Sequence, residues 1–230
     1  MRNRRVQVRL GKHDGRALLL VGRSAARGQV HDTSPVSERD LFWQWARAES
    51  DSERYGASFL GSLSGRLIAR LDSNTWEGLD DADWTDIERA VLAIRGQYLS
   101  SLLELGVKWY SGKFMTSDLQ DVRLIQYAPF LHVAPSRMMS EFVAELDGGN
   151  DPPGDPFGPH YRKVRSRFEP NRMRGSPILA SETRTGPYLE VEGLMRMAIL
   201  LSRLKRGEPV PPRITVMVGV CPRLPEWRWF

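Results

Sequence analysis

The feature that most constrains this chain is a corner where an apolar strand passes into a helix through a single glycine. Residues 187–191 are β-prone, and Glu192 and Gly193 follow them directly. Apolar residues then recur at helical spacing, at Leu194, Met197, Ala198, Leu201 and Leu204. Glycine permits a sharp turn, and the first turn of a helix carries unpaired N–H groups at its positive end. The corner therefore predicts a binding site for an anion such as phosphate.

The segments around this corner complete a small α/β unit. Gly207 and the proline-rich stretch 209–212 end the helix, and residues 214–220 form an apolar, valine-rich run that predicts a strand. Residues 176–180 predict another short strand. We expect residues 188–191 and 214–220 to be parallel strands joined by a right-handed crossover, because the connections are short.

The first two thirds of the chain predict a different organisation. Residues 1–35 should form a β-hairpin, from runs 6–10 and 17–21 around Asp14-Gly15, followed by a polar loop. Residues 36–147 should be mostly helical, with Ser37 and Asp40 as a capping box and Ser117 with Gln120 as a second one. Helices are expected over residues 37–48, 55–71, 83–105, 117–125 and 135–146.

Prolines and glycines crowd residues 148–159, which predicts a linker or loop without regular structure. We expect a small α/β domain over residues 160–230 after it. The fold class is therefore α+β, with a mostly helical N-terminal half and a C-terminal α/β domain.

Two stretches carry a resemblance to a known fold. Ser176-Pro-Ile-Leu-Ala, and Gly186-Pro-Tyr-Leu-Glu-Val-Glu-Gly-Leu-Met-Arg after it, resemble the ParB/sulfiredoxin-like fold over residues 160–222. That fold's signature at this corner is an acidic residue or glycine followed by Gly-x-x-Arg. Sulfiredoxins place a cysteine where this chain has Leu194, which excludes sulfinic-acid reduction.

The other members of the fold imply nucleotide binding. The chromosome-partitioning ParB proteins bind CTP and have Gly-Glu-Arg-Arg where this chain has Gly193-Leu-Met-Arg196. The free-serine kinases have Asp-Gly-x-His-Arg; here Glu192, Gly193 and Arg196 match in kind and Met195 replaces the histidine. The resemblance therefore implies ATP or CTP, with Mg²⁺, as the ligand.

The corner itself supplies the candidate site. Backbone N–H groups of Gly193, Leu194 and Met195 and the guanidinium of Arg196 are the predicted phosphate contacts. Glu190 and Glu192 flank Val191, and we expect one side chain on each side of the strand. The carboxylate on the open side would bind Mg²⁺ or take a proton, so both glutamates are catalytic candidates.

A run of arginines precedes the corner, and the net charge of the whole chain is +5. Such a run indicates contacts with nucleic acid or nucleotide phosphate, although a solvated surface has the same composition. The candidate contacts are Arg162, Arg165, Arg167, Arg172 and Arg174.

Several partners are not expected. Cys221 is the single cysteine and the four histidines are isolated, so no structural zinc site is predicted. No apolar run reaches the roughly 18 residues of a membrane span, and the charged start is no signal peptide. We expect a cytoplasmic protein without a membrane partner; its oligomeric state stays open.

Two hypotheses follow. The first is an ATP- or CTP-dependent enzyme, a phosphotransferase or hydrolase acting on a small molecule or nucleic acid, because phosphoryl transfer depends mainly on positioning and charge neutralisation. The second is a non-catalytic DNA- or RNA-binding module that uses the arginine-rich face. The corner favours the first. A scaffold whose helical half binds a partner is a third reading.

Overall fold

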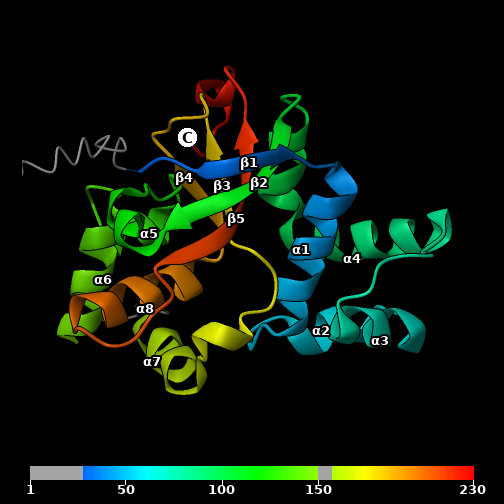
Figure 1. The fold of residues 1–230 in the computed structure, drawn as a ribbon, viewed down its shortest axis with the longest axis horizontal. Coiled ribbons are helices and arrows are strands. Elements are labelled where there is room, and N and C mark those ends of the chain that lie inside the picture. The colour runs from blue at the N-terminus through cyan, green and yellow to red at the C-terminus, as the bar shows by residue number, and fades with distance from the viewer. Residues whose placement is uncertain (1–27, 150–156) are drawn as a thin grey trace, which may run out of the picture.

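The computed structural model describes residues 28–149 and 157–230 and contains both helices and a five-stranded sheet, which confirms the α+β class (Figure 1). The strands are β1 (His31–Pro35), β2 (Lys108–Met115), β3 (Ile178–Ser181), β4 (Leu189–Glu192) and β5 (Arg213–Val220). The α-helices are α1 (Glu38–Ser50), α2 (Gly56–Gly61), α3 (Gly65–Ser73), α4 (Asp81–Leu103), α5 (Ala128–Val133), α6 (Met139–Gly148), α7 (Phe157–Arg167) and α8 (Leu194–Lys205). Three 3₁₀ turns are η1 (Thr116–Asp121), η2 (Pro170–Arg172) and η3 (Leu224–Glu226).

The strands lie in the order β1-β2-β5-β3-β4. β2 runs antiparallel to β5, β5 runs parallel to β3, and β3 runs antiparallel to β4. The expected parallel pairing of residues 188–191 with 214–220 is therefore wrong. These strands share the sheet, but β3 lies between them and they run in opposite directions. The parallel partner of β5 is β3, because the chain turns back through β4 before it enters α8.

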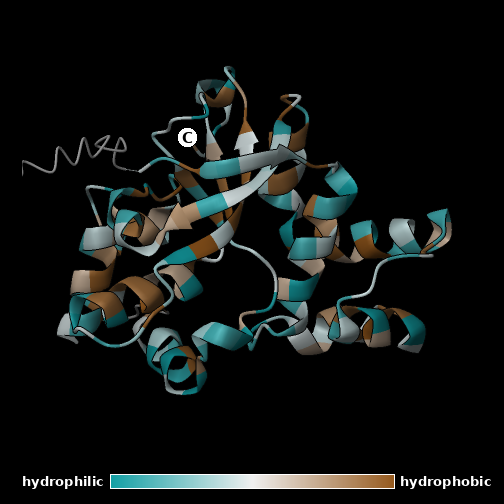
Figure 2. Cartoon of the chain, viewed as in Figure 1, coloured by the Kyte–Doolittle hydropathy of each residue, from teal (hydrophilic) through white to brown (hydrophobic). Residues whose placement is uncertain are grey.

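The sheet is covered on both faces, which makes three layers. Successive side chains of a strand point to opposite faces. Ile178 and Ala180 accordingly pack in a core with α1–α4, whereas Leu179 packs in a second core with α5–α8. Figure 2 shows apolar residues on the central strands and on α8, while α7 is largely hydrophilic.

The two strands nearest the N-terminus, β1 and β2, were not expected from the sequence. β2 lies in the region expected to be helical, and β1 lies in the expected polar loop. Trp109 and Phe114 of β2 are five residues apart, so they point to opposite faces of the sheet and pack in different cores. The strand has neither a long apolar run nor a regular alternation of polar and apolar residues, so its sequence contained no strand signal.

Some helix boundaries agree with the capping signals in the sequence better than the strands agree with their expected positions. Ser37 and Asp40 form both bonds of the expected capping box. The expected helix 55–71 is instead broken into α2 and α3, with Ser64 capping α3. The expected helix from Ser117 is wrong, because that stretch forms the 3₁₀ turn η1, whose N-cap position is Met115 and carries no side-chain cap.

Two expected segments fall largely outside the described residues. The hairpin expected over residues 6–21 lies there entirely. The expected linker 148–159 lies there over residues 150–156, whereas its two ends belong to α6 and α7 rather than to a loop.

Gly175 fixes how the loop before β3 approaches α1. Its φ is +65°, and a Cβ at this position would collide with the carbonyl oxygen of Gln44 and lie 2.9 Å from the backbone nitrogen of Ala48. The neighbouring Ser176 N–H donates to the side-chain oxygen of Gln44 at 3.0 Å. Glycine is required here both for its conformation and for the close approach.

We predict that Gly175→Ala lowers the free energy of unfolding by about 3 kcal/mol, because the substitution adds a backbone collision to the cost of a left-handed conformation. Chemical denaturation measures this. Gly207→Ala is the matched control: its φ is +71° but nothing lies within 4 Å of the added Cβ. It should cost only about 1 kcal/mol. Equal losses in the two variants would contradict the close-approach argument.

Candidate functional site

The β4–α8 corner opens into a cavity of about 970 Å³. Its walls come from segments that lie far apart in the sequence: the loop from α1 to α2, the middle of α4, α7 with the turn after it, and the corner itself. This size suits a small molecule of nucleotide dimensions.

All the predicted corner residues line this cavity: Glu190, Glu192, Gly193, Leu194, Met195 and Arg196. Gly193 is the N-cap of α8 with a φ of +101°, as the corner requires. Both glutamates line the same cavity, although they pair with strand residues that face opposite sides of the sheet. A β-bulge lies between them, where Glu190 pairs with Leu179 and Glu192 with Ile178.

Arg95 of α4 links the layer formed by α1–α4 to this corner. Its Nε donates to Glu49 Oε1 of α1 at 2.6 Å, and its Nη2 lies 3.7 Å from Glu192 Oε2. Burial lowers the pKa of Arg95, but the neighbouring Glu192, Tyr98 and Glu49 raise it overall, so the guanidinium stays charged. Its side chain is 20% exposed and that of Glu49 only 1%. The carboxylate of Glu192 is therefore held by a cation from the other layer.

Sequence reasoning missed both Arg95 and Glu49. Arg95 directly follows Ile94 in the apolar stripe of the expected helix 83–105, and Glu49 stands at the end of the first one. A charged residue beside an apolar stripe was the available signal. It was weak, because charged residues next to a stripe usually point to solvent.

Arg196 is not free for a ligand. Its Nη1 donates to the carbonyl oxygens of Arg174 and Gly175, the latter at 2.7 Å, and its Nη2 donates to Glu192 Oε1 at 3.3 Å. The side chain is 14% exposed. The guanidinium predicted for phosphate is instead half-buried and links the corner to the loop before β3.

Glu190 is the buried titratable group of the site. Its side-chain atom Oε2 has no hydrogen-bond partner in the described part of the chain. Burial raises the pKa of Glu190 to about 8, and the charge of Glu192 adds to this. Arg95, the backbone N–H of Leu194 and Arg196 act in the opposite direction but do not outweigh burial. The carboxyl therefore carries a proton at neutral pH, and it faces the helix N-terminus predicted for phosphate.

Aromatic side chains form much of the remaining wall. The Tyr127 ring lies 5.1 Å from Phe130 and 6.1 Å from Trp229, centroid to centroid. Tyr55 lies under the guanidinium of Arg95 at 4.6 Å. Burial raises the pKa of Tyr98 well above its ordinary value, so this phenol stays neutral. The wall can therefore stack a planar ring as well as bind polar groups.

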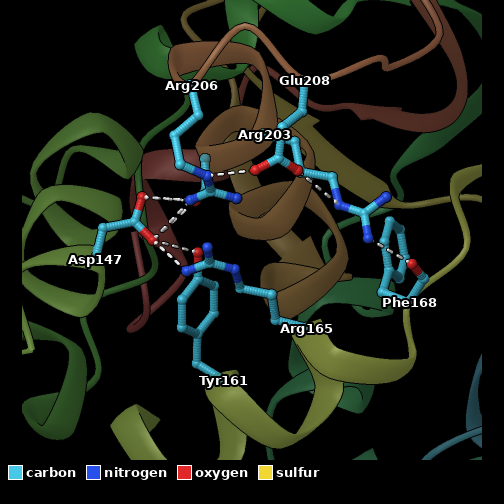
Figure 3. Close-up of polar contacts among 8 residues, drawn as sticks. Asp147, Tyr161, Arg165, Phe168, Arg203, Arg206 and Glu208 are labelled. Carbon is cyan, nitrogen blue, oxygen red and sulfur yellow. Dashed lines mark hydrogen bonds and ion pairs between the residues drawn. The ribbon is translucent and has the colours of Figure 1, made fainter.

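The predicted arginine run divides into two groups. Arg167, Arg172 and Arg174 line the cavity, whereas Arg162 and Arg165 are on α7 outside its wall. Figure 3 shows Arg165 directed toward Asp147 of α6, where it pairs at 3.1 Å. Asp147 also accepts hydrogen bonds from Tyr161 at 2.9 Å and from Ser202 of α8. Arg165 therefore links α7 to α6.

In the two described stretches, no three His, Cys, Asp or Glu side chains gather closely enough to hold a metal ion. None of the helices that the structure describes combines the length and apolar composition that crossing a bilayer requires.

A scan against protein-family models, a search of curated proteins and a search of solved structures each found no match to this chain. The resemblance to the ParB/sulfiredoxin-like fold therefore stays a prediction.

We predict that stability falls as pH rises from about 5 to 9. Glu190 has a folded pKa of about 8 against roughly 4.3 when unfolded, so its contribution is full at low pH and is lost as pH passes 8. Glu190→Gln should flatten the dependence of Tm on pH; burial also raises the pKa of Glu49, so some slope should remain. Differential scanning calorimetry measures this.

The control for this experiment is Glu226→Gln. Arg223 lowers the pKa of that exposed carboxylate, which therefore titrates below this range. The wild-type slope should persist in this variant. An unchanged slope in Glu190→Gln would show that Glu190 is ionised in the folded protein.

Proposed function

We propose that this protein binds a phosphate-bearing ligand of the nucleotide class in the cavity at the β4–α8 corner. The observation that carries this proposal is the composition of the cavity wall, which brings arginines and aromatic rings together around about 970 Å³. Arginine recognises phosphate through its planar fork of donors, and an aromatic wall stacks a base.

The phosphate end of the ligand fits the exposed arginines of the wall. Arg167 and Arg172 are paired with Glu53 and Glu169, yet their side chains are 71% and 81% exposed. Exposed ion pairs contribute little to stability, so a phosphate can replace the carboxylate. These two side chains, rather than Arg196, are therefore the arginines that we assign to phosphate.

The interior of the cavity fits a neutral polar group. The protonated carboxyl of Glu190 donates a hydrogen bond, and the Tyr98 hydroxyl can donate or accept one. A hydroxyl or ring nitrogen of the ligand suits this environment better than a phosphate does.

The glutamates of the corner do not fit Mg²⁺. One oxygen of Glu192 pairs with Arg95 and the other with Arg196, while Glu190 is neutral at pH 7. In proteins, magnesium is usually held by one or two carboxylates that are free to bind it. We therefore propose nucleotide binding without a metal ion at these residues, and no phosphotransfer step through one.

The structure favours a small ligand over nucleic acid. Arginines of the run pair with carboxylates from separate elements: Arg165 with Asp147, Arg167 with Glu53, and Arg174 with Asp72 at 2.6 Å. These pairs direct the arginines toward different neighbours, whereas a groove for a nucleic-acid backbone needs a continuous basic face.

We predict that ADP or CDP binds with the same affinity in Mg²⁺ and in EDTA, and that Arg172→Ala weakens binding about tenfold or more, because a charge-assisted contact is worth roughly 1.5–3 kcal/mol. Isothermal titration calorimetry measures this. Arg89→Ala is the matched control: Arg89 also pairs with a carboxylate three residues away, is 71% exposed, and lies outside the cavity.

Three results would count against this function. Equal losses in Arg172→Ala and Arg89→Ala would show diffuse electrostatics. Nucleotide binding that requires Mg²⁺ would contradict the assignment of Glu190 and Glu192. Steeply salt-dependent binding of DNA or RNA without nucleotide binding would move the nucleic-acid hypothesis ahead.

The aromatic wall gives an independent prediction. Tyr127→Ala should weaken nucleotide binding at least about fivefold, because stacking of a base on an aromatic ring is worth roughly 1–3 kcal/mol. Trp76→Ala is the control, since Trp76 is 43% exposed, comparable with 40% for Tyr127, and lies outside the cavity wall. Fluorescence titration with a labelled nucleotide measures both. A ligand without a base, such as pyrophosphate, should bind Tyr127→Ala as tightly as the wild type.

A further inference from the structure

The loop between α1 and α2 is tied to α7 by one carboxylate. Glu53 Oε2 lies 2.9 Å from Lys163 Nζ, and Glu53 Oε1 lies 2.5 Å from Arg167 Nη1. Glu53 and Arg167 both line the cavity. The contact therefore joins two walls of the cavity that lie far apart in the sequence.

The cations around Glu53 outnumber it. His160, Lys163 and Arg167 are three and four residues apart, so they share one face of α7. Burial lowers the pKa of His160, Glu53 acts to raise it, and Arg54 and Lys163 act to lower it, which places these groups around one another. One carboxylate thus faces two permanent cations, with a third cation and an imidazole beside it.

Arg54 adds to this imbalance. Its guanidinium lies 4.9 Å from the centroid of the Tyr55 ring, and within residues 28–149 and 157–230 it pairs with no carboxylate. Arg54 is exposed and lines the cavity. A further anion at this place would therefore meet a cation that is available to bind it.

We propose that Arg54, His160, Lys163 and Arg167 form the subsite for the terminal phosphate of the ligand, and that Glu53 holds this subsite until phosphate displaces it. The inference rests on the function proposed above and assigns the place of one group. A phosphate carries about two charges and three acceptor oxygens, so it balances the cluster better than a single carboxylate does. The side chains of Lys163 and Arg167 are 58% and 71% exposed, so an anion from solvent reaches them.

The test is a gain of affinity in Glu53→Gln. Glutamine keeps the size of the side chain but removes the competing charge. Inorganic pyrophosphate and ADP should bind this variant about fivefold or more tightly than the wild type by isothermal titration calorimetry. The double variant Glu53→Gln/Lys163→Ala should lose the gain. If the contacts of Glu53 with Lys163 and Arg167 were only structural, Glu53→Gln would bind these ligands equally well or more weakly. That result would overturn the proposal.

The matched control is Asp51→Asn, which removes one negative charge from the same loop and the same cavity wall. Its carboxylate forms no ion pair in the described ranges, so its affinity for pyrophosphate should change less than twofold. Equal gains in the two variants would mean that the net charge of the wall matters and the subsite does not.

A second readout does not depend on affinity. The His160 ring is titrated by NMR in the wild type and in Glu53→Gln, with and without inorganic phosphate. Loss of Glu53 should lower the His160 pKa, and phosphate should raise it again in the variant. If Glu53→Gln fails to fold, Lys163→Ala in the wild-type background replaces it and should weaken pyrophosphate binding about fivefold.

The outcomes separate this inference from the proposed function. If the wild type binds ADP but Glu53→Gln binds it no better, the subsite is wrong and the nucleotide site stands. If neither protein binds ADP or pyrophosphate and phosphate leaves His160 unchanged, the proposed function fails and the subsite fails with it.

Discussion

One half-buried cation, Arg95, links the layers of this fold, because it lies between Glu49 of α1 and Glu192 of β4. Glu49 belongs to the layer formed by α1–α4, and Glu192 belongs to the edge strand of the sheet. Glu192 also pairs with Arg196 of α8, so acidic and basic side chains alternate from α1 to α8. A buried charge is strongly unfavourable without a partner, so removing one member leaves the others unpaired. The network therefore fixes the register between α4 and the corner, and it lets two glutamates lie side by side at the floor of a cavity.

The same network changes what the corner can do. A strand–glycine–helix turn offers an anion site, yet here Glu190 faces the N–H of Leu194 and Arg196 binds carbonyl groups of the chain itself. The donors that this corner would offer to a phosphate are therefore already bound by groups of the chain itself. The cations that outnumber their carboxylate partners lie farther out, on the loop after α1 and on α7. We therefore place the anionic part of a ligand there.

Local signals predicted the parts of the structure that depend on a few neighbouring residues. The capping box at Ser37, the glycine at 193 and the strands at both sides of α8 are such cases. Strand order and direction were mispredicted, because the partner of β5 is chosen by packing over distant segments. The corner residues of the site could be predicted for the same local reason. Arg95 and Glu53 could not, since each becomes part of the site only when another layer is placed against it.

The division of the cavity wall between the two layers has a consequence for how the protein unfolds. Tyr55 and Arg95 come from the layer formed by α1–α4, while Met195 and Phe168 pack in the core on the other side of the sheet. A molecule bound among them acts as a non-covalent cross-link, because opening either layer releases it. Binding should therefore increase cooperativity as well as stability, so that amide protons in α4 and α8 exchange through the same opening event when the cavity is occupied.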